Sequence, residues 1–108
     1  MHLTNAHKYM LSEYIHYDIL NSDPLFRARP MFGGYGLYYD GVFFGIIADE
    51  VIYLYTTHIS SSDNVFTYTK HGRVIPLRHY HQIPDDILDD MEEFSVYIDT
   101  AIAQAREK

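Results

Sequence analysis

Cysteine and tryptophan are both absent from the 108-residue sequence. Without cysteine, neither a disulfide framework nor a zinc site built on thiolates is available. Long hydrophobic runs are also missing, since no stretch approaches the roughly 18 apolar residues that a membrane span needs. Residues 2–8 lack the apolar centre of a signal peptide. These absences predict a cytoplasmic protein that does not enter a membrane.

Positive charge is scarce, with 8 Lys and Arg residues against 15 Asp and Glu residues and a net charge of -7. Because nucleic-acid binding depends on clustered cations, this balance predicts weak direct DNA binding at most. The negative charge is concentrated, with six of the 15 carboxylates between residues 85 and 93. Lys70, Arg73 and Arg78 lie close together outside that segment, so a local basic face is compatible with the sequence.

A length of 108 residues is enough for one hydrophobic core and too short for two, so a single domain spanning residues 1–108 is expected. Apolar residues recur at helical spacing from Leu11 to Ile19, which predicts a helix over residues 5–20. Helical spacing returns after Pro84 and predicts a second amphipathic helix. Its apolar stripe comprises Ile87, Met91, Phe94, Ile98, Ala101, Ile102 and Ala105.

Between these helices, short aromatic and β-branched runs alternate with turn residues, a pattern typical of β-strands. Two-residue turns at 40–41, 49–50 and 71–72 separate neighbouring runs, which predicts antiparallel hairpins. Pro76 lacks a backbone N–H and therefore predicts an edge position for its strand. The expected fold is α+β in two layers, with an N-terminal helix, an antiparallel meander sheet of about six strands and a C-terminal helix. The strands are expected at residues 28–32, 35–39, 42–48, 51–55, 65–70 and 73–77.

Glycine and aromatic residues are concentrated in one run from residue 31 to residue 48. Glycines that precede a helix can bind phosphate, but here the glycines at 33, 34 and 36 precede a predicted strand. We therefore interpret them as a sharp turn or bulge where two backbones approach closely. The structural motif comprises Met31, Phe32, Gly33, Gly34, Gly36, Asp40 and Gly41.

This run resembles the N-terminal domain of the TfoX/Sxy family, bacterial proteins associated with the regulation of natural competence. The resemblance rests on Met-Phe-Gly-Gly-Tyr-Gly-Leu at 31–37, on Asp40–Gly41, on Phe-Gly-Ile-Ile-Ala at 44–48 and on Ile-Tyr-Leu at 52–54. It extends over essentially the whole chain, without the helical C-terminal domain of full-length relatives. It implies an α+β domain and does not imply catalysis or a cofactor.

The resemblance also implies a kind of partner. Full-length relatives act as transcriptional co-regulators together with the cyclic AMP receptor protein. A transcription factor of that type is therefore the protein partner that the resemblance implies for this chain.

Two sets of residues are candidates for partner binding. Tyr53 and Tyr55 alternate along one strand and share a face, which would expose an aromatic patch if it lies away from the helices. Such a patch suits a partner protein or a homodimer through the sheet, whereas packing in the core is the alternative. The second set would form a basic face if its two segments are neighbours in the sheet, and is otherwise ordinary solvated charge. It comprises Arg27, Arg29, Lys70, Arg73 and Arg78.

His79 and His81 are weak candidates for a metal site. On an extended backbone both imidazoles would project from the same face and could share an ion. No cysteine or carboxylate stands at tight spacing with them, so no native metal is expected. The alternative function is a small-ligand or metal-binding domain, with a pocket between sheet and helices and these two histidines near its mouth.

The polar loop at 58–63 supplies the residue types of a hydrolytic triad, but not a reason to expect one. Ser60, Ser61 and Ser62 are sequence neighbours of His58 and Asp63. A triad needs its base held by a third group on a rigid scaffold, and the sequence shows no nucleophile elbow. We therefore predict a non-enzymatic protein-interaction module.

Overall fold

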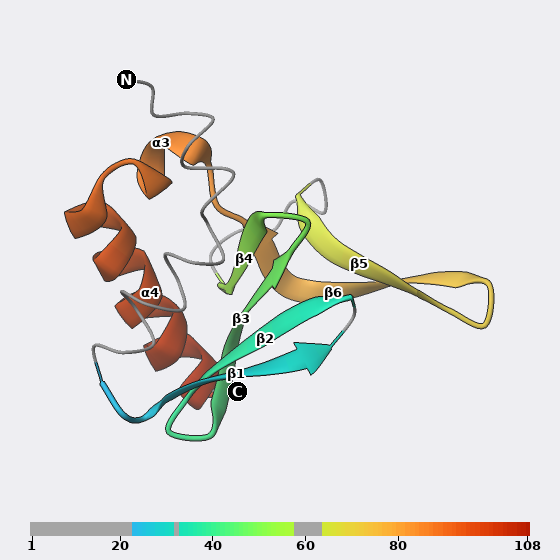
Figure 1. The fold of residues 1–108 in the computed structure, drawn as a ribbon, viewed down its shortest axis with the longest axis horizontal. Coiled ribbons are helices and arrows are strands. Elements are labelled where there is room, and N and C mark those ends of the chain that lie inside the picture. Colours follow the sequence, from blue (N-terminus) through green and yellow to red (C-terminus); the bar gives the residue numbers. More distant parts are fainter. Residues whose placement is uncertain (1–22, 32, 58–63) are drawn as a thin grey trace.

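The fold is an antiparallel sheet of six strands with one long helix packed on β3 and β4 (Figure 1). The structure, a computed structural model, describes residues 23–31, 33–57 and 64–108. The helix predicted at 5–20 lies outside the described residues. The elements are β1 (Phe26–Met31), β2 (Gly34–Tyr39), β3 (Val42–Ala48), β4 (Val51–Tyr55), β5 (Val65–Lys70), β6 (Arg73–Gln82), α3 (Asp85–Leu88) and α4 (Met91–Arg106).

Local turn chemistry forms the hairpins, as predicted. Asp40 and Gly41 connect the paired residues Tyr39 of β2 and Val42 of β3. Their φ angles are 52° and 80°. The turns at 49–50 and 71–72 likewise place both central residues at positive φ. Two consecutive left-handed residues give a turn whose twist matches that of the flanking strands. The antiparallel pairing of β2, β3 and β4 in sequence order follows from the first two of these short connections.

The complete sheet is not a meander, because its order is β1-β2-β3-β4-β6-β5. The predicted edge position of the Pro76 strand is therefore wrong, since β6 lies between β4 and β5. The reason is that β6 has ten residues, more than predicted, and uses two partners along its length. Its residues 80–82 pair with β4, whereas Pro76 pairs with Thr67 of β5. Pro76 thus avoids the β4 pairing without lying in an edge strand.

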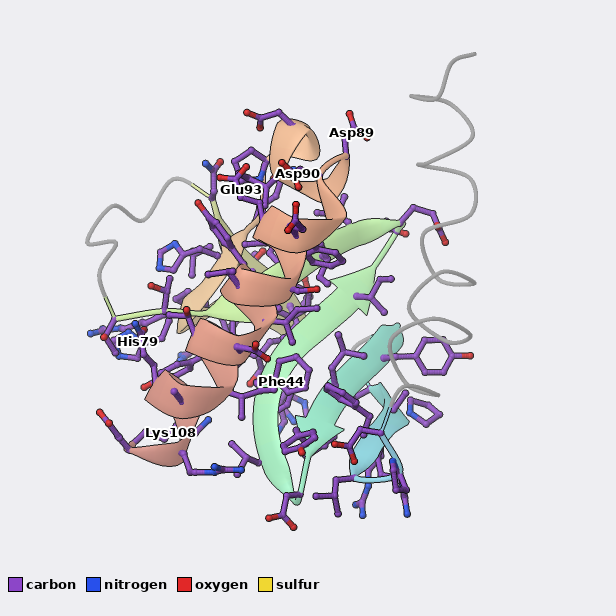
Figure 2. The ribbon with its side chains drawn as sticks, turned by 90° about the vertical axis from the view of Figure 1, so that its left-hand side faces the viewer. Phe44, His79, Asp89, Asp90, Glu93 and Lys108 are labelled. Atoms are coloured by element: carbon purple, nitrogen blue, oxygen red, sulfur yellow. The ribbon has the colours of Figure 1, made fainter. Side chains whose placement is uncertain are left out.

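A bulge in β3 places an additional aromatic ring in the core. Leu37 pairs with Gly45 and Tyr38 pairs with Phe43, so Phe44 is the extra residue of β3. A bulge bends its strand and increases the local twist. The Phe44 side chain, labelled in Figure 2, is only 1% exposed, and its ring lies 6.0 Å from that of Phe26.

The C-terminal helical segment is interrupted once, which the periodicity alone did not predict. Asp90 separates α3 from α4 and has an extended backbone with φ of -111°. Its carboxylate accepts hydrogen bonds from the backbone N–H groups of Glu92 and Glu93, which would otherwise lack helical partners. The predicted apolar stripe is confirmed by the buried residues Ile87, Phe94, Ile98, Ala101, Ile102 and Ala105.

Gly34 marks the closest approach of β2 and β3. A Cβ atom at this position would overlap the backbone carbonyl oxygen of Ile47 and lie 2.9 Å from the Cα of Ala48. Backbone cannot move aside as a flexible side chain can, so only glycine fits here. This confirms the close backbone approach that the glycine run predicted.

We expect Gly34→Ala to lower the free energy of unfolding by about 3 kcal/mol, the upper range for overpacking. The matched control is Gly72→Ala. A Cβ at Gly72 meets nothing within 4 Å, although its φ is +78°. The control should lose only about 1–2 kcal/mol, the strain of a left-handed alanine. Urea denaturation followed by circular dichroism measures both, and equal losses would contradict the packing argument.

Candidate functional site

The outer part of the β5–β6 hairpin projects from the body of the protein (Figure 1). We call residues 67–79 the hairpin arm. In the arm, β5 and β6 pair with each other, from the pair Thr67 and Pro76 to the pair Lys70 and Arg73. Among the described residues, β4 pairs only with residues 80–82 of β6. A two-stranded ribbon has no core of its own, and Val74 in the arm is 69% exposed. The outer end of the arm is therefore exposed, whereas Tyr68 and Leu77 are partly buried against the core.

The hairpin arm is basic in a protein that is otherwise acidic. Lys70 and Arg73 flank the turn at its tip, Arg78 lies toward its base, and all three are exposed. The arm contains no Asp or Glu. In contrast, Asp89, Asp90 and Glu93 gather at the start of α4, as Figure 2 shows. Charge is thus segregated between two parts of one small domain.

Arg29 does not join the cations of the hairpin arm. It belongs to β1, and β1 and β5 are the opposite edges of the sheet. Its guanidinium lies over the ring of Tyr38, 5.4 Å from the ring centroid. The prediction of a continuous basic face that includes Arg29 is therefore wrong, and the basic cluster is confined to the hairpin arm. The sequence could not settle this, because it required the strand order.

Tyr53 and Tyr55 do not form an exposed aromatic patch. Tyr55 is 6% exposed and belongs to the core. Tyr53 is half-buried and packs edge-on against Phe66, with ring centroids 5.1 Å apart. The expectation of exposure is corrected because side chains from β5 and β6 cover these rings.

An aromatic column crosses four strands and holds the end of the chain. The rings of Tyr38 and Phe43 are stacked at 5.1 Å, and those of Phe43 and Tyr80 at 4.8 Å. Tyr55 meets Tyr80 edge-on at 5.4 Å. The Lys108 ammonium lies 4.8 Å from the Tyr55 ring centroid and donates a hydrogen bond of 2.8 Å to the Tyr80 hydroxyl. The Tyr80 hydroxyl in turn donates to the Phe43 carbonyl oxygen at 3.0 Å.

Burial shifts the pKa values of two groups in this column. It raises the pKa of the Tyr80 hydroxyl far above its usual range, and the neighbouring Tyr55 and Tyr38 hydroxyls act in the same direction. Burial also lowers the pKa of the Lys108 ammonium. Strand alternation gave no sign of this cluster, because its members come from distant segments.

The raised pKa of Tyr80 predicts a loss of stability in alkali. The unfolded chain releases the Tyr80 proton near pH 10, whereas the folded protein retains it. Stability is therefore fully present below pH 10 and falls as the pH rises, by up to about 1.4 kcal/mol per pH unit from this group. We expect Tyr80→Phe to show a flatter decline between about pH 10 and 12 in urea titrations. The same slope in both proteins would contradict burial as the cause.

A cavity of about 290 Å³ lies between α4 and the paired strands β4 and β6. Its base includes His81, which is only 2% exposed. Neither ring nitrogen of His81 has a hydrogen-bond partner among the described residues. An unpaired buried polar group is costly and needs a physical explanation.

His79 and His81 lie in different environments. His79, labelled in Figure 2, is exposed with its ring 5.4 Å from that of Tyr55, whereas His81 is buried. Within the ranges that the structure describes, no three His, Cys, Asp or Glu residues are grouped closely enough to hold a metal ion. The loop with His58, Ser60, Ser61, Ser62 and Asp63 lies outside those ranges.

We expect His81→Leu to raise the free energy of unfolding by about 1 kcal/mol. Leucine removes two unpaired polar atoms from an apolar site, and such atoms typically cost about 1–3 kcal/mol. The control His79→Leu changes an exposed histidine of the same strand and should stay within about 0.5 kcal/mol of wild type. Thermal and urea unfolding measure both variants. A clear loss of stability in His81→Leu would mean that the imidazole has a partner in solution.

Together, the six-stranded antiparallel sheet and helix α4 give the described part of the chain an α+β fold. Over residues 18–105 the chain matches the TfoX N-terminal domain, and it belongs to that family. This confirms the resemblance carried by the glycine-aromatic run. No curated protein matches the chain. In the part of the chain that the structure describes, no helix has the length and apolar character to span a membrane.

Proposed function

We propose that this protein is a non-enzymatic interaction module of transcription regulation, and that its hairpin arm docks onto an acidic surface of a partner protein. The observation that carries the proposal is the projecting arm with exposed Lys70, Arg73 and Arg78. Membership in the TfoX N-terminal domain family supports a regulatory role.

The charge distribution favours a protein partner over DNA. Three arginine and lysine side chains on an arm that contains no Asp or Glu attract an acidic patch and orient the approach of a partner. A DNA duplex carries dense negative charge along its whole length, and the net charge of -7 repels it. Exposed Val74 adds apolar contact area to the basic arm.

A transcription factor of the cyclic AMP receptor type is the proposed partner, because the family resemblance implies it. We therefore propose that the protein acts in the cytoplasm of a bacterium. A homodimer is the alternative assembly, and sedimentation of the isolated protein tests it. Regulation of competence is the proposed setting of the interaction.

We expect the double variant Lys70→Glu/Arg73→Glu to weaken binding to the host's cyclic AMP receptor protein at least tenfold, as loss of paired charge does at interfaces. The matched control Arg27→Glu/Arg29→Glu makes the same charge change on β1, the opposite sheet edge. It should retain nearly the wild-type dissociation constant. Biolayer interferometry with purified proteins and cyclic AMP measures all three.

Equal weakening in both variants would show that net charge, not the arm, decides binding. Absence of binding by the wild type would overturn the proposed partner. Anisotropy with a labelled DNA duplex provides the competing result: tight wild-type binding that falls steeply with salt would replace the protein partner with DNA. Transcript levels in a deletion strain, complemented with each variant, connect binding to regulation.

A further inference from the structure

The cavity between α4 and the β4–β6 pair is separate from the hairpin arm and has room for a small molecule. Its 290 Å³ corresponds to the liquid volume of about ten water molecules. A molecule with a single ring therefore fits. The backbone N–H of Thr57 donates a hydrogen bond of 2.9 Å to Oε1 of Gln104, which ties the chain after β4 to α4 beside the cavity. The space is thus bounded by fixed elements.

The rim of the cavity exposes apolar side chains. Val96 is 60% exposed and Tyr97 is 40% exposed, the two largest such exposures on α4. Both line the cavity, although neither belongs to the buried apolar stripe of the helix. A molecule held in the cavity would remove part of this apolar surface from water.

His81 lines the cavity, but both nitrogens of its unpaired imidazole are fully buried. An imidazole ring has two nitrogens that can form hydrogen bonds, and neither has a partner among the described residues. A turn of this ring toward the cavity would let one hydroxyl or N–H group of a ligand supply the missing hydrogen bond. The buried histidine therefore provides a polar recognition point in an apolar wall.

The remaining walls favour an uncharged ligand. A charged group in the cavity would be buried without a counter-charge, because the lining contains no Lys, Arg, Asp or Glu. The lining residues are Leu54, Tyr55, Thr56, His81, Ile83, Val96, Tyr97, Thr100 and Ala101.

We propose that this cavity binds a small uncharged molecule, with an apolar ring or chain and one hydroxyl or N–H group that hydrogen-bonds to His81. Phenols, indoles and short alcohols have this chemistry. The cavity filled in this way accounts at once for the unpaired imidazole and for the exposed rim. The inference is independent of the partner that the hairpin arm binds.

Three probe molecules that share a methyl-substituted benzene ring test the proposal: p-cresol, toluene and 4-methylbenzoate. Titration of the ¹⁵N-labelled protein by NMR gives the dissociation constant and locates the site. We expect p-cresol to shift the amides of cavity residues and to bind about fivefold tighter than toluene, the gain from one hydrogen bond. The charged 4-methylbenzoate should bind at least tenfold more weakly than p-cresol.

Two variants test separately the hydrogen bond to His81 and the volume of the cavity. His81→Leu should bind p-cresol and toluene equally, whereas the control His79→Leu should retain the fivefold preference. Thr100→Phe, which adds a ring at the cavity wall, should weaken all binding tenfold or more without affecting His81 itself. It keeps the test informative if His81→Leu does not fold.

Several results would overturn the proposal. These are no shift of cavity amides in the wild type near saturation with p-cresol, tightest binding of 4-methylbenzoate, or an unchanged preference in His81→Leu. Spectral changes that depend on protein concentration alone would show a second copy on this surface and would also overturn it. The arm variant Lys70→Glu/Arg73→Glu should bind p-cresol as the wild type does, so failure of the arm and failure of the cavity are distinguishable.

Discussion

The structure depends on the way β6 divides its pairing between two strands. Its last residues, 80–82, join β4 and complete the sheet, while the part around Pro76 pairs with β5. The first pairing places Tyr80 and His81 in the core. The second carries the outer hairpin away from the body, where a two-stranded ribbon cannot bury a face. One strand thus produces both the basic arm and the base of the cavity.

The two candidate sites rely on different physical forces. On the hairpin arm, exposed cations act over distance and through water, which suits the capture and orientation of an acidic surface. In the cavity, burial removes water and makes a single unpaired imidazole significant. The aromatic column around Tyr80 adjoins the cavity, because Tyr55 belongs to both. It stabilises the junction of β3, β4 and β6 and holds Lys108 at the end of the helix.

Much of the local structure could be predicted from sequence. The two-residue turns, the strands on either side of them and the apolar stripe of α4 depend on neighbours in the chain, and the structure confirms them. The order of the last two strands could not be predicted, because both orders satisfy the same hairpin turn. The surroundings of Tyr55 and His81 depend on the strand that lies beside them, so the sequence left the burial of both residues open.

By itself, the sequence determined the glycine positions, the turn types, the helical stripe and the family, since each rests on backbone sterics or on spacing within a segment. Only the tertiary structure decided which cations share a surface and which histidine is buried. It also decided where an apolar gap opens. These properties arise from contacts between segments far apart in the chain, and side-chain periodicity carries no record of such contacts.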